Sequence, residues 1–477
     1  VRLVQYLYNR SLWADEAVLA LNIVNRSYLE LLQPLDYDQG APFGFLIVEK
    51  LAVQLFGNNE YALRLFPLLS GIISLLLFHQ LAKVFLRGYA VPIALAFFAS
   101  LYYLVYYATE LKQYSSDVAV TLFSCLLVTE IFRKRLSISR VILFSVLGAL
   151  TIWFSHPAIF VLAGFGASYL LINVLKKKKF NLFKVLLIYS TWLISFALFY
   201  FVSVQSLNKN QDLMTSWQDA FPSSAFDIIW LFDAFGKFFY LPLDFRGIMD
   251  GVAIFAFVIG CISLFYRRKE KLLIILSPLI VTFFAAYLQK YPFRGRLVLF
   301  LIPFFVLLIA EGVHSLIIKT RSKPTVIVGI ILLVSLLFQP ITKAGNLLIN
   351  PNWNEEIKLV LNYVKSNEQP SDILYVFQRG HYQFLYYADK YGYQEGDYII
   401  GVDDLDKYDG RNLSDEERKR YENDLNKLRG NKRVWVIFSH SHVGSENAMM
   451  KSYLNKIGKQ LDYFESPGAF VYLYDLS

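Results

Sequence analysis

Long apolar runs separated by short charged segments constrain the fold of this chain more than any other feature of its sequence. An α-helix needs about 20 apolar residues to cross a hydrocarbon layer about 30 Å thick. Ten runs of about that size occur, and 56% of all residues are hydrophobic whereas only 18% are charged. This pattern excludes a soluble globular protein and predicts a polytopic α-helical membrane protein. The runs lie near residues 62–82, 89–108, 115–132, 141–155, 157–175, 183–204, 250–266, 272–289, 297–318 and 325–345.

Lysine and arginine are unevenly distributed over the connections between these runs. Alternate connections hold 18 of them, whereas the opposite connections hold only seven, although these include the long external loop predicted at 205–249. Basic loops stay on the cytoplasmic side of a membrane, so we predict that the opposite connections face outwards. The basic connections are 83–87, 133–140, 176–184, 267–271 and 319–323.

The first outward segment, residues 10–61, is expected to form an external loop. The stretch before Trp13 is too short to cross a membrane, so we expect a further helix upstream, which would give eleven spans with the N-terminus inside. Within the loop, residues 43–57 are apolar but interrupted by Glu49, Lys50 and Gln54. Such a segment is typical of a helix that lies in the membrane interface.

Charge and composition change near residue 350. Residues 1–350 contain 31 Lys and Arg against 18 Asp and Glu, whereas residues 351–477 contain 16 against 20. The excess positive charge therefore belongs to the membrane part, where it orients spans, and nucleic acid is not an expected partner. We predict a transmembrane domain over 1–349 and a soluble, extracytoplasmic α/β domain over 350–477.

The C-terminal part alternates short apolar runs with charged segments. This order predicts a small α/β layer with a mainly parallel sheet. Ser414 and Glu417 form a capping-box pattern at the start of the third helix. Cys125 and Cys261 both lie in apolar runs of the membrane part, so the sequence offers no disulfide framework. The expected strands are 373–377, 398–402, 434–438 and 470–474, and the expected helices are 353–366, 381–391, 414–429 and 446–458.

Three short motifs occur in and just after the first external loop. They read SLWADEA at 11–17, QPLDYDQGAPF at 33–43 and LFGNNEYALRL at 55–65. In combination they resemble the first external loop of the polyprenyl-phosphate-sugar-dependent glycosyltransferases of the GT-C fold, the group of the protein O-mannosyltransferases and the lipid A aminoarabinose transferases. The resemblance covers about residues 10–115 well, and the remaining spans only in topology and spacing. It implies a GT-C membrane domain followed by an extracytoplasmic α/β domain.

The acidic pair Asp15 and Glu16 is the first candidate for catalysis. Transfer of a sugar to a hydroxyl group needs a carboxylate that accepts the acceptor proton. The resemblance implies that Asp15 is this general base, and that the adjacent Glu16 orients it, binds the acceptor or holds a cation. The simpler interpretation is that the pair only starts an interfacial helix, where acidic side chains are favoured.

Basic residues on the predicted outer face are candidates for binding the donor phosphate. Lys112 lies in a Glu-x-Lys-x-Tyr stretch with Glu110 and Tyr114, which the resemblance places beside the active site. Arg294 and Arg296 lie at the outer end of a late span, against the positive-inside bias, and a guanidinium group suits phosphate geometry. The alternatives are an ordinary helix-end lysine for Lys112 and lipid head-group anchoring for the arginines.

Several residues could contact the donor or a divalent cation. His156 precedes Pro157 at an outer junction where some relatives carry a histidine, although a helix-end hydrogen bond explains it equally simply. Gln39 stands where some aminoarabinose-transferase relatives have a Glu-Lys pair, so the donor sugar and any metal stay open. His440 and His442 follow a predicted strand, but the sequence shows no third ligand. No metal site is assigned.

The resemblance implies an inverting membrane glycosyltransferase, and we expect it in the bacterial inner membrane. It would move a hexosyl or pentosyl group from a polyprenyl-monophosphate carrier to an extracytoplasmic protein, lipid or glycan. The donor and acceptor, together with membrane lipids, are the expected partners, and no nucleotide or redox cofactor is needed. The alternative class is a polytopic transporter or lipid-carrier flippase. Transporters, however, concentrate ionisable groups near the bilayer midplane, whereas this chain places them at one surface.

Overall fold

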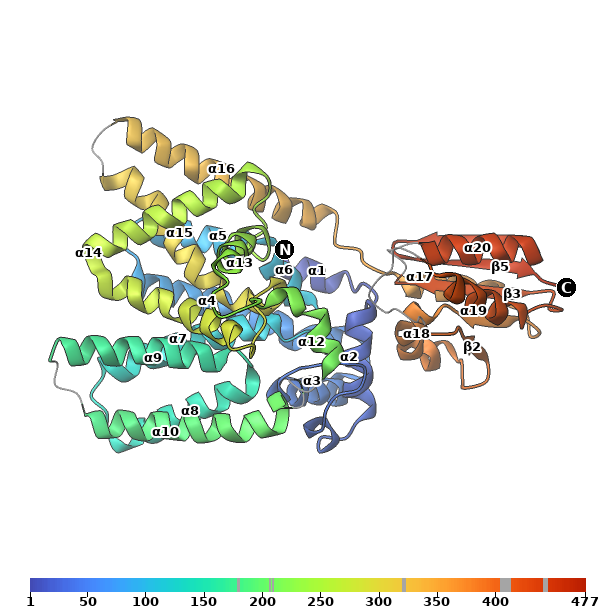
Figure 1. The fold of residues 1–477 in the computed structure, drawn as a ribbon, viewed down its shortest axis with the longest axis horizontal. Coiled ribbons are helices and arrows are strands. Elements are labelled where there is room, and N and C mark those ends of the chain that lie inside the picture. The colour runs from blue at the N-terminus through green and yellow to red at the C-terminus, as the bar shows by residue number, and fades with distance from the viewer. Residues whose placement is uncertain (178–180, 206, 208–209, 320–322, 404–412, 441–444) are drawn as a thin grey trace. The chain divides into compact units, whose positions relative to one another are not determined.

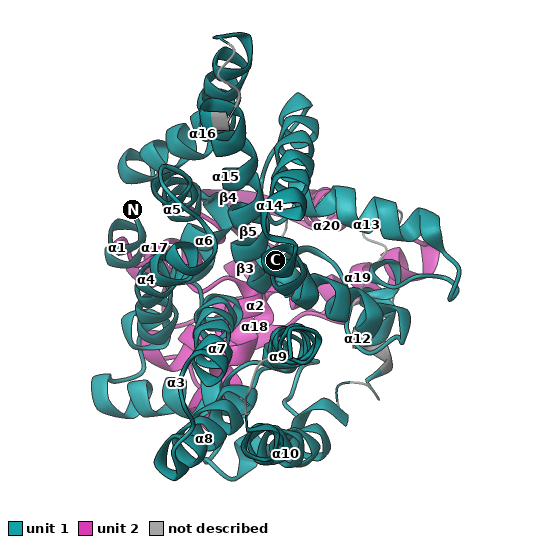
Figure 2. Ribbon diagram, turned by 90° about the vertical axis from the view of Figure 1, so that its left-hand side faces the viewer, with its two compact units in different colours: residues 1–7, 26–351 teal, residues 8–25, 352–477 magenta. Residues whose placement is uncertain are grey.

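The computed structural model describes residues 1–177, 181–205, 207, 210–319, 323–403, 413–440 and 445–477. The chain forms two compact units, shown in different colours in Figure 2. Unit 1 comprises residues 1–7 and 26–351, and unit 2 comprises residues 8–25 and 352–477. The C-terminal segment of unit 2 begins at Asn352, near the composition change at residue 350. Unit 2 also includes residues 8–25, whereas residues 26–61 of the first external loop belong to unit 1.

Unit 1 consists of apolar helices joined by short connections (Figure 1). Seven of its described helices are long and apolar enough to cross a membrane, or eight if the bent pair α5 and α6 is one span. The α-helices are α1 (Arg2–Leu7), α3 (Phe43–Phe56), α4 (Glu60–Phe85), α5 (Ala90–Ser100), α6 (Tyr102–Tyr106), α7 (Tyr114–Arg133), α8 (Ile138–Phe154), α9 (Ala158–Leu175), α10 (Leu182–Phe199), α12 (Gln211–Ser216), α13 (Ile228–Tyr240), α14 (Ile248–Tyr287), α15 (Ile302–Lys319) and α16 (Lys323–Ile349).

All ten predicted runs are helical, but they do not make ten separate long helices. The runs at 250–266 and 272–289 both lie in α14, which has 40 residues and would be about 60 Å long if straight. That is about twice the hydrocarbon thickness. The backbone leaves the helical conformation at Arg268 (φ −155°, ψ 61°), which divides α14 into two span-sized halves. The run at 141–155 forms α8, which has only 17 residues.

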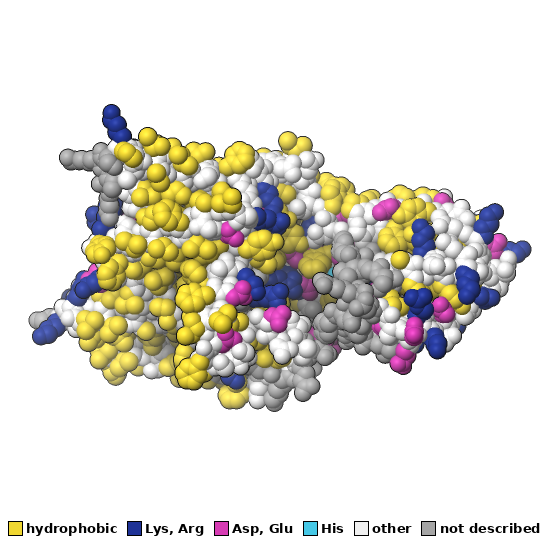
Figure 3. Space-filling model, turned by 45° about the horizontal axis from the view of Figure 1, so that its top comes forward, with side chains coloured by type: hydrophobic (Ala, Val, Ile, Leu, Met, Phe, Trp, Pro, Cys, Tyr) yellow, Lys and Arg dark blue, Asp and Glu magenta, His cyan; other side chains and the backbone are white. Residues whose placement is uncertain are grey.

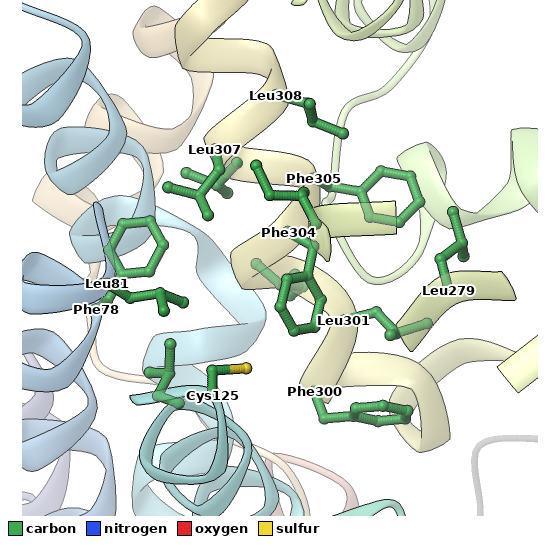
Figure 4. Close-up of a cluster of buried hydrophobic side chains, with 14 of the residues drawn as sticks. Phe78, Leu81, Cys125, Leu279, Phe300, Leu301, Phe304, Phe305, Leu307 and Leu308 are labelled. Carbon is green, nitrogen blue, oxygen red and sulfur yellow. The ribbon is translucent and has the colours of Figure 1, made fainter. Parts of the chain in front are cut away.

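The core of unit 1 is centred on α15 and the 3₁₀ turn before it. In the segment Gly295–Ile318, 94% of the apolar span is buried, compared with 22% in Lys323–Ile349. Phe305 stacks on Phe238 with ring centroids 3.9 Å apart, and Figure 4 shows it among the surrounding apolar side chains. A Cβ atom on Gly260 would lie 1.9 Å from the carbonyl oxygen of Leu308, so glycine permits α14 and α15 to pack at backbone distance.

The basic connections gather at one end of unit 1, as the charge pattern predicts. Lys176 pairs with Glu270 at 2.8 Å, which joins the connection after α9 to the bend of α14. Lys271 donates to the carbonyl oxygen of Phe85 (3.1 Å), and Lys184 donates to that of Leu136 (2.7 Å). Figure 3 shows Lys and Arg at this end, beyond the hydrophobic surface of the helices. Residues 178–180 and 320–322 of these connections lie outside the described residues.

Unit 2 contains a five-stranded mixed sheet in the order β2-β1-β3-β5-β4. The sequence predicts four of these strands, and the capping box at Ser414 and Glu417 is confirmed. The prediction of a mainly parallel sheet is only half right. Strand β1 pairs in parallel with β2 and β3, whereas β5 pairs antiparallel with β3 and β4. The elements are α2 (Ala14–Asn25), α17 (Ile357–Asn367), β1 (Ile373–Val376), α18 (His381–Ala388), β2 (Tyr398–Ile400), α19 (Asp415–Asn426), β3 (Val434–Ser439), α20 (Ser445–Ile457), β4 (Lys459–Ser466) and β5 (Ala469–Asp475).

The segment expected to lie in the interface forms α3, and it carries one buried acid. Glu49 is 0% exposed, and neither of its carboxylate oxygens has a hydrogen-bond partner among the described residues. Burial raises the pKa of Glu49 well above its ordinary value. The carboxyl group is therefore most stable in its neutral form.

Replacing Glu49 by glutamine is expected to raise the midpoint of thermal unfolding at pH 8 and to leave it nearly unchanged near pH 4. When an acidic side chain has a higher pKa in the folded state than in the unfolded state, the folded protein loses stability as the pH rises above the unfolded-state pKa. Glu49→Gln removes that loss. The gain at pH 8 is expected to be about 1.4 kcal/mol for each unit by which the folded-state pKa of Glu49 exceeds its unfolded-state pKa, up to pH 8. Thermal unfolding of both proteins in detergent at the two pH values measures it, and an equal effect at both would contradict a neutral Glu49.

Candidate active site

The acidic pair of the first external loop lies in the first turn of α2. Nine of the twelve residues of this helix are buried, and α2 packs on α18 of the same unit. Asp15 is partly exposed, whereas Glu16 is fully buried. The helix start anticipated for this pair is therefore present, and of the two acids only Asp15 presents its side chain to the surroundings of unit 2.

Glu16 forms an ion pair inside its own segment. Its Oε2 atom is 3.0 Å from Nη1 of Arg10, and both side chains are almost completely buried. The same oxygen also accepts a hydrogen bond from the backbone N–H of Trp13 (3.4 Å). These contacts fix the turn that precedes α2, so Glu16 is suited to orienting its neighbour. Its role in binding acceptor or cation stays a prediction.

Two glutamates at the start of α17 hold this turn from the other side. The N–H of Ala14 donates to Glu355 (2.9 Å). Glu356 accepts hydrogen bonds from both the N–H and the hydroxyl group of Ser11, at 3.0 and 2.9 Å. Both glutamates are buried, at 1% and 3% exposure. A buried carboxylate that accepts backbone N–H groups at the start of a helix is a strong, charge-assisted cap.

Two residues of α18, together with Glu355 and Glu356, form a clamp on the segment before α2. The hydroxyl group of Tyr387 accepts from the N–H of Leu12 (2.9 Å), and Nε2 of Gln383 donates to the carbonyl oxygen of Leu12 (2.8 Å). No motif in the sequence points to the residues that hold this segment, which are Glu355, Glu356, Gln383 and Tyr387. They lie more than 340 positions from Leu12 and share no motif with it, so only the fold brings them together.

In unit 1, the structure brings two of the predicted donor-binding residues together. Nζ of Lys112 donates to Oε1 of Gln39 at 2.7 Å, although the two lie 73 positions apart. Beside them, Nε2 of Gln113 donates to the carbonyl oxygen of Gly40 (3.1 Å). Lys112 is only 4% exposed, and Glu110 is completely buried. An ordinary helix-end lysine keeps its charged amino group in water, whereas the side chain of Lys112 is buried.

The two outer arginines differ in their surroundings. Arg296 lies over the ring of Tyr114, with its guanidinium carbon 5.5 Å from the ring centroid, and so contacts the stretch that carries Lys112. Arg294 is half exposed and lies 3.7 Å from the exposed Asp219. It also lines a cavity of about 890 Å³, together with α13 and the loop before it. Arg296 is therefore the better candidate for a role beside Lys112.

His156 lies between α8 and α9 and contacts the end of α10. Its Nε2 atom is 3.3 Å from the hydroxyl group of Ser203, and its ring is 5.4 Å from that of Phe199. Burial lowers the pKa of His156 to about 4, so the imidazole is neutral at pH 7. These contacts are typical of a helix-end histidine, and a contact of His156 with the donor or a divalent cation stays a prediction.

The pattern of ligand-type residues does not indicate a metal centre. Among the residues that the structure describes, no three His, Cys, Asp or Glu side chains lie close enough together to hold a metal ion. His440 follows β3 and contacts Glu355, whereas His442 lies outside the described residues.

No protein-family model and no curated protein sequence matches the chain. Solved structures do match. ArnT from Cupriavidus metallidurans bound to undecaprenyl phosphate has a TM-score of 0.55 at 12% identity, covering 99% of this chain and 96% of that one. The Archaeoglobus fulgidus oligosaccharyltransferase in complex with Zn and sulfate gives 0.52 at 13%, covering 99% and 72%. AglB from the same organism, in complex with an inhibitory peptide and a dolichol-phosphate, gives 0.50 at 11%, covering 98% and 71%.

These matches include both units of the chain, because they cover nearly all of its residues. The proteins matched are transferases of the GT-C type. At this level of sequence identity, the matches establish the fold and leave the reaction to be argued from the residues. The chain therefore has the GT-C fold that the motifs of its first external loop predict.

Proposed function

We propose that the protein is a membrane glycosyltransferase that moves a sugar from a polyprenyl-monophosphate carrier to an extracytoplasmic acceptor, with inversion. The observation that carries this proposal is a GT-C fold over 99% of the chain, shared with an ArnT structure whose bound ligand is undecaprenyl phosphate. A partly exposed acid in a rigid turn, Asp15, and a buried lysine, Lys112, support it, because they are the two kinds of group that this reaction needs.

Each residue has a distinct role in this reaction. The acceptor oxygen attacks the anomeric carbon of the sugar while the bond from that carbon to the phosphate oxygen breaks. The acceptor proton passes to the carboxylate of Asp15, and the carrier phosphate leaves with the bonding electrons. Lys112, oriented by Gln39, and Arg296 stabilise the charge that develops on the phosphate. The balance requires no nucleotide and no redox cofactor.

The sugar and the acceptor are proposed only as classes. The sugar is a hexose or a pentose, and the acceptor is a protein, a lipid or a glycan at the membrane surface. The AglB structure is in complex with an inhibitory peptide and a dolichol-phosphate, and the ArnT structure is bound to undecaprenyl phosphate, so these neighbours favour no single acceptor class.

We further propose that the protein lies in a bacterial inner membrane with unit 2 outside the cytoplasm. The proposal rests on the basic end of unit 1, which would face the cytoplasm by the positive-inside rule. Lys112, Gln39 and Arg296 belong to connections opposite to that end, and so would face outwards.

A transfer assay in sealed vesicles of defined orientation tests both the reaction and the sidedness. Labelled polyprenyl-phosphate hexose or pentose is added to the membrane, and impermeant peptides or glycolipids are added outside. Sugar transfer or release is expected only in right-side-out vesicles. Transfer only in inverted vesicles would reverse the topology. Movement of the lipid or of a solute without any sugar transfer would favour a transporter.

A further inference from the structure

A carboxylate–histidine pair adjoins the helix that carries Asp15, and the proposed reaction does not use it. Nδ1 of His440 lies 2.6 Å from Oε1 of Glu355, while the other oxygen of Glu355 accepts the N–H of Ala14 at 2.9 Å. One buried carboxylate thus joins the imidazole of His440 to the first turn of α2. Trp13, which precedes this turn, has its indole 6.5 Å from the imidazole ring.

The position of His440 is held at a conformational cost. It directly follows β3, the middle strand of the sheet, and its φ angle of 57° lies in the left-handed region. Non-glycine residues adopt this region only where surrounding contacts enforce it, often at functional sites. The side chain keeps 41% of its surface exposed, so the imidazole is fixed by Glu355 and still accessible.

The charges around His440 favour its protonated form. Burial lowers the pKa of His440, but the hydrogen bond and the charge of Glu355 raise it, and the net result is a pKa above the ordinary value. Among the other charged groups that act on it, Arg379 opposes protonation and Asp15 favours it. Arg379 is itself paired with Glu446 at 2.6 Å. By reciprocity, a protonated His440 stabilises the ionised form of Asp15.

We propose that Glu355 and His440 are positioning residues for Asp15: Glu355 fixes the first turn of α2, and the imidazolium of His440 keeps the Asp15 carboxylate in its ionised form, the form that can act as a base, down to lower pH. The pair acts through Asp15 and does not touch the sugar or the phosphate. This inference deepens the proposed transferase reaction and rests on it for its kinetic consequence. Its electrostatic consequence is independent of any reaction.

The electrostatic consequence can be measured on the full-length protein by NMR. The chain has six histidines, so isotope-labelled histidine gives few signals, and His440→Gln identifies the signal of His440 by difference. The His440 titration is expected above the ordinary histidine range, lower in Asp15→Asn, and lowest in Glu355→Gln. An unchanged His440 titration in Asp15→Asn would overturn the proposal, whether or not any transfer activity is found.

The kinetic consequence is a shift of the pH profile. In His440→Gln, the acidic limb of kcat/KM is expected to move to higher pH by about one unit, the scale of a lost opposite charge nearby. A change in rate at every pH without a shift would indicate a structural role only and would overturn the proposal. His381→Gln is the matched control, because His381 belongs to the same unit and its Nδ1 contacts the carbonyl oxygen of Gln378 rather than the first turn of α2. It is expected to leave the profile in place.

The two measurements separate failure of this inference from failure of the proposed function. A His440 titration that responds to Asp15→Asn, in a protein without sugar transfer, would keep the charge coupling and reject the transferase. A normal transfer reaction with an unresponsive His440 would keep the transferase and reject the positioning role.

Discussion

Replacing Asp15 by asparagine is expected to lower sugar transfer by about 10²–10⁴-fold, the usual contribution of a positioned general base. The amide has nearly the same size as the carboxylate but cannot accept the acceptor proton. The clamp on the preceding turn uses backbone groups of Ser11, Leu12 and Ala14, so it survives the substitution. Donor binding is expected to stay unchanged, and initial rates with separately measured binding of the polyprenyl-phosphate sugar distinguish the two effects.

Asp415→Asn is the matched control for this variant. Asp415 is also an acid in the first turn of a helix of unit 2, but it is exposed and lies on α19. It is expected to retain full activity. Equal turnover of Asp15→Asn and the unmodified protein would remove Asp15 as the base. A parallel loss of donor binding would instead assign it to the binding of the carrier.

The helices were predictable because their signals are local. A membrane span needs a fixed length of apolar residues, so the positions of α4, α7 and α9 follow directly from the sequence. The start of α19 was predictable for the same reason, since the capping box requires only Ser414 and Glu417. The joining of two apolar runs into α14 was not predictable, because a charged bend within a helix and a charged loop between two helices have the same composition.

The strand β4 escaped prediction because it lies at the edge of the sheet. Its residues Lys459–Ser466 are mostly exposed, and only its contact with β5 makes it a strand. An edge strand with one partner does not need an apolar run. The same missed hairpin explains why the sheet is mixed and not mainly parallel.

The candidate site was predictable only in part. Motifs pointed to Asp15, Lys112 and Arg296 as candidates, because these residues are charged and lie in or next to the predicted outward connections. The groups that hold them were beyond reach, since Glu355 and Gln383 become partners of residues 11–14 only when residues 8–25 pack into unit 2. Contacts between such distant parts of a chain leave no periodic pattern in its sequence.

Replacing Lys112 by methionine is expected to lower kcat/KM for the lipid-linked donor by about 10²-fold or more, the effect of removing one preorganised group that stabilises transition-state charge. Methionine fills a similar volume, so the buried position is kept while the charge is lost. Lys112→Arg is expected to recover part of the activity because it retains the charge. Gln39→Leu is expected to cause a smaller loss, since it removes only the hydrogen bond at 2.7 Å that orients the ammonium group.

Lys290→Met is the matched control for Lys112→Met, because Lys290 lies in another outward connection of unit 1 but is exposed. It is expected to change neither donor affinity nor turnover. Direct binding of polyprenyl phosphate without a sugar completes the test: if Lys112 binds the phosphate, the affinity for this product falls together with kcat/KM. Unchanged phosphate affinity with lost activity would contradict that role. The buried lysine would then act on the local structure around Gln39 and Gly40, and Arg296 would be the remaining candidate for the phosphate charge.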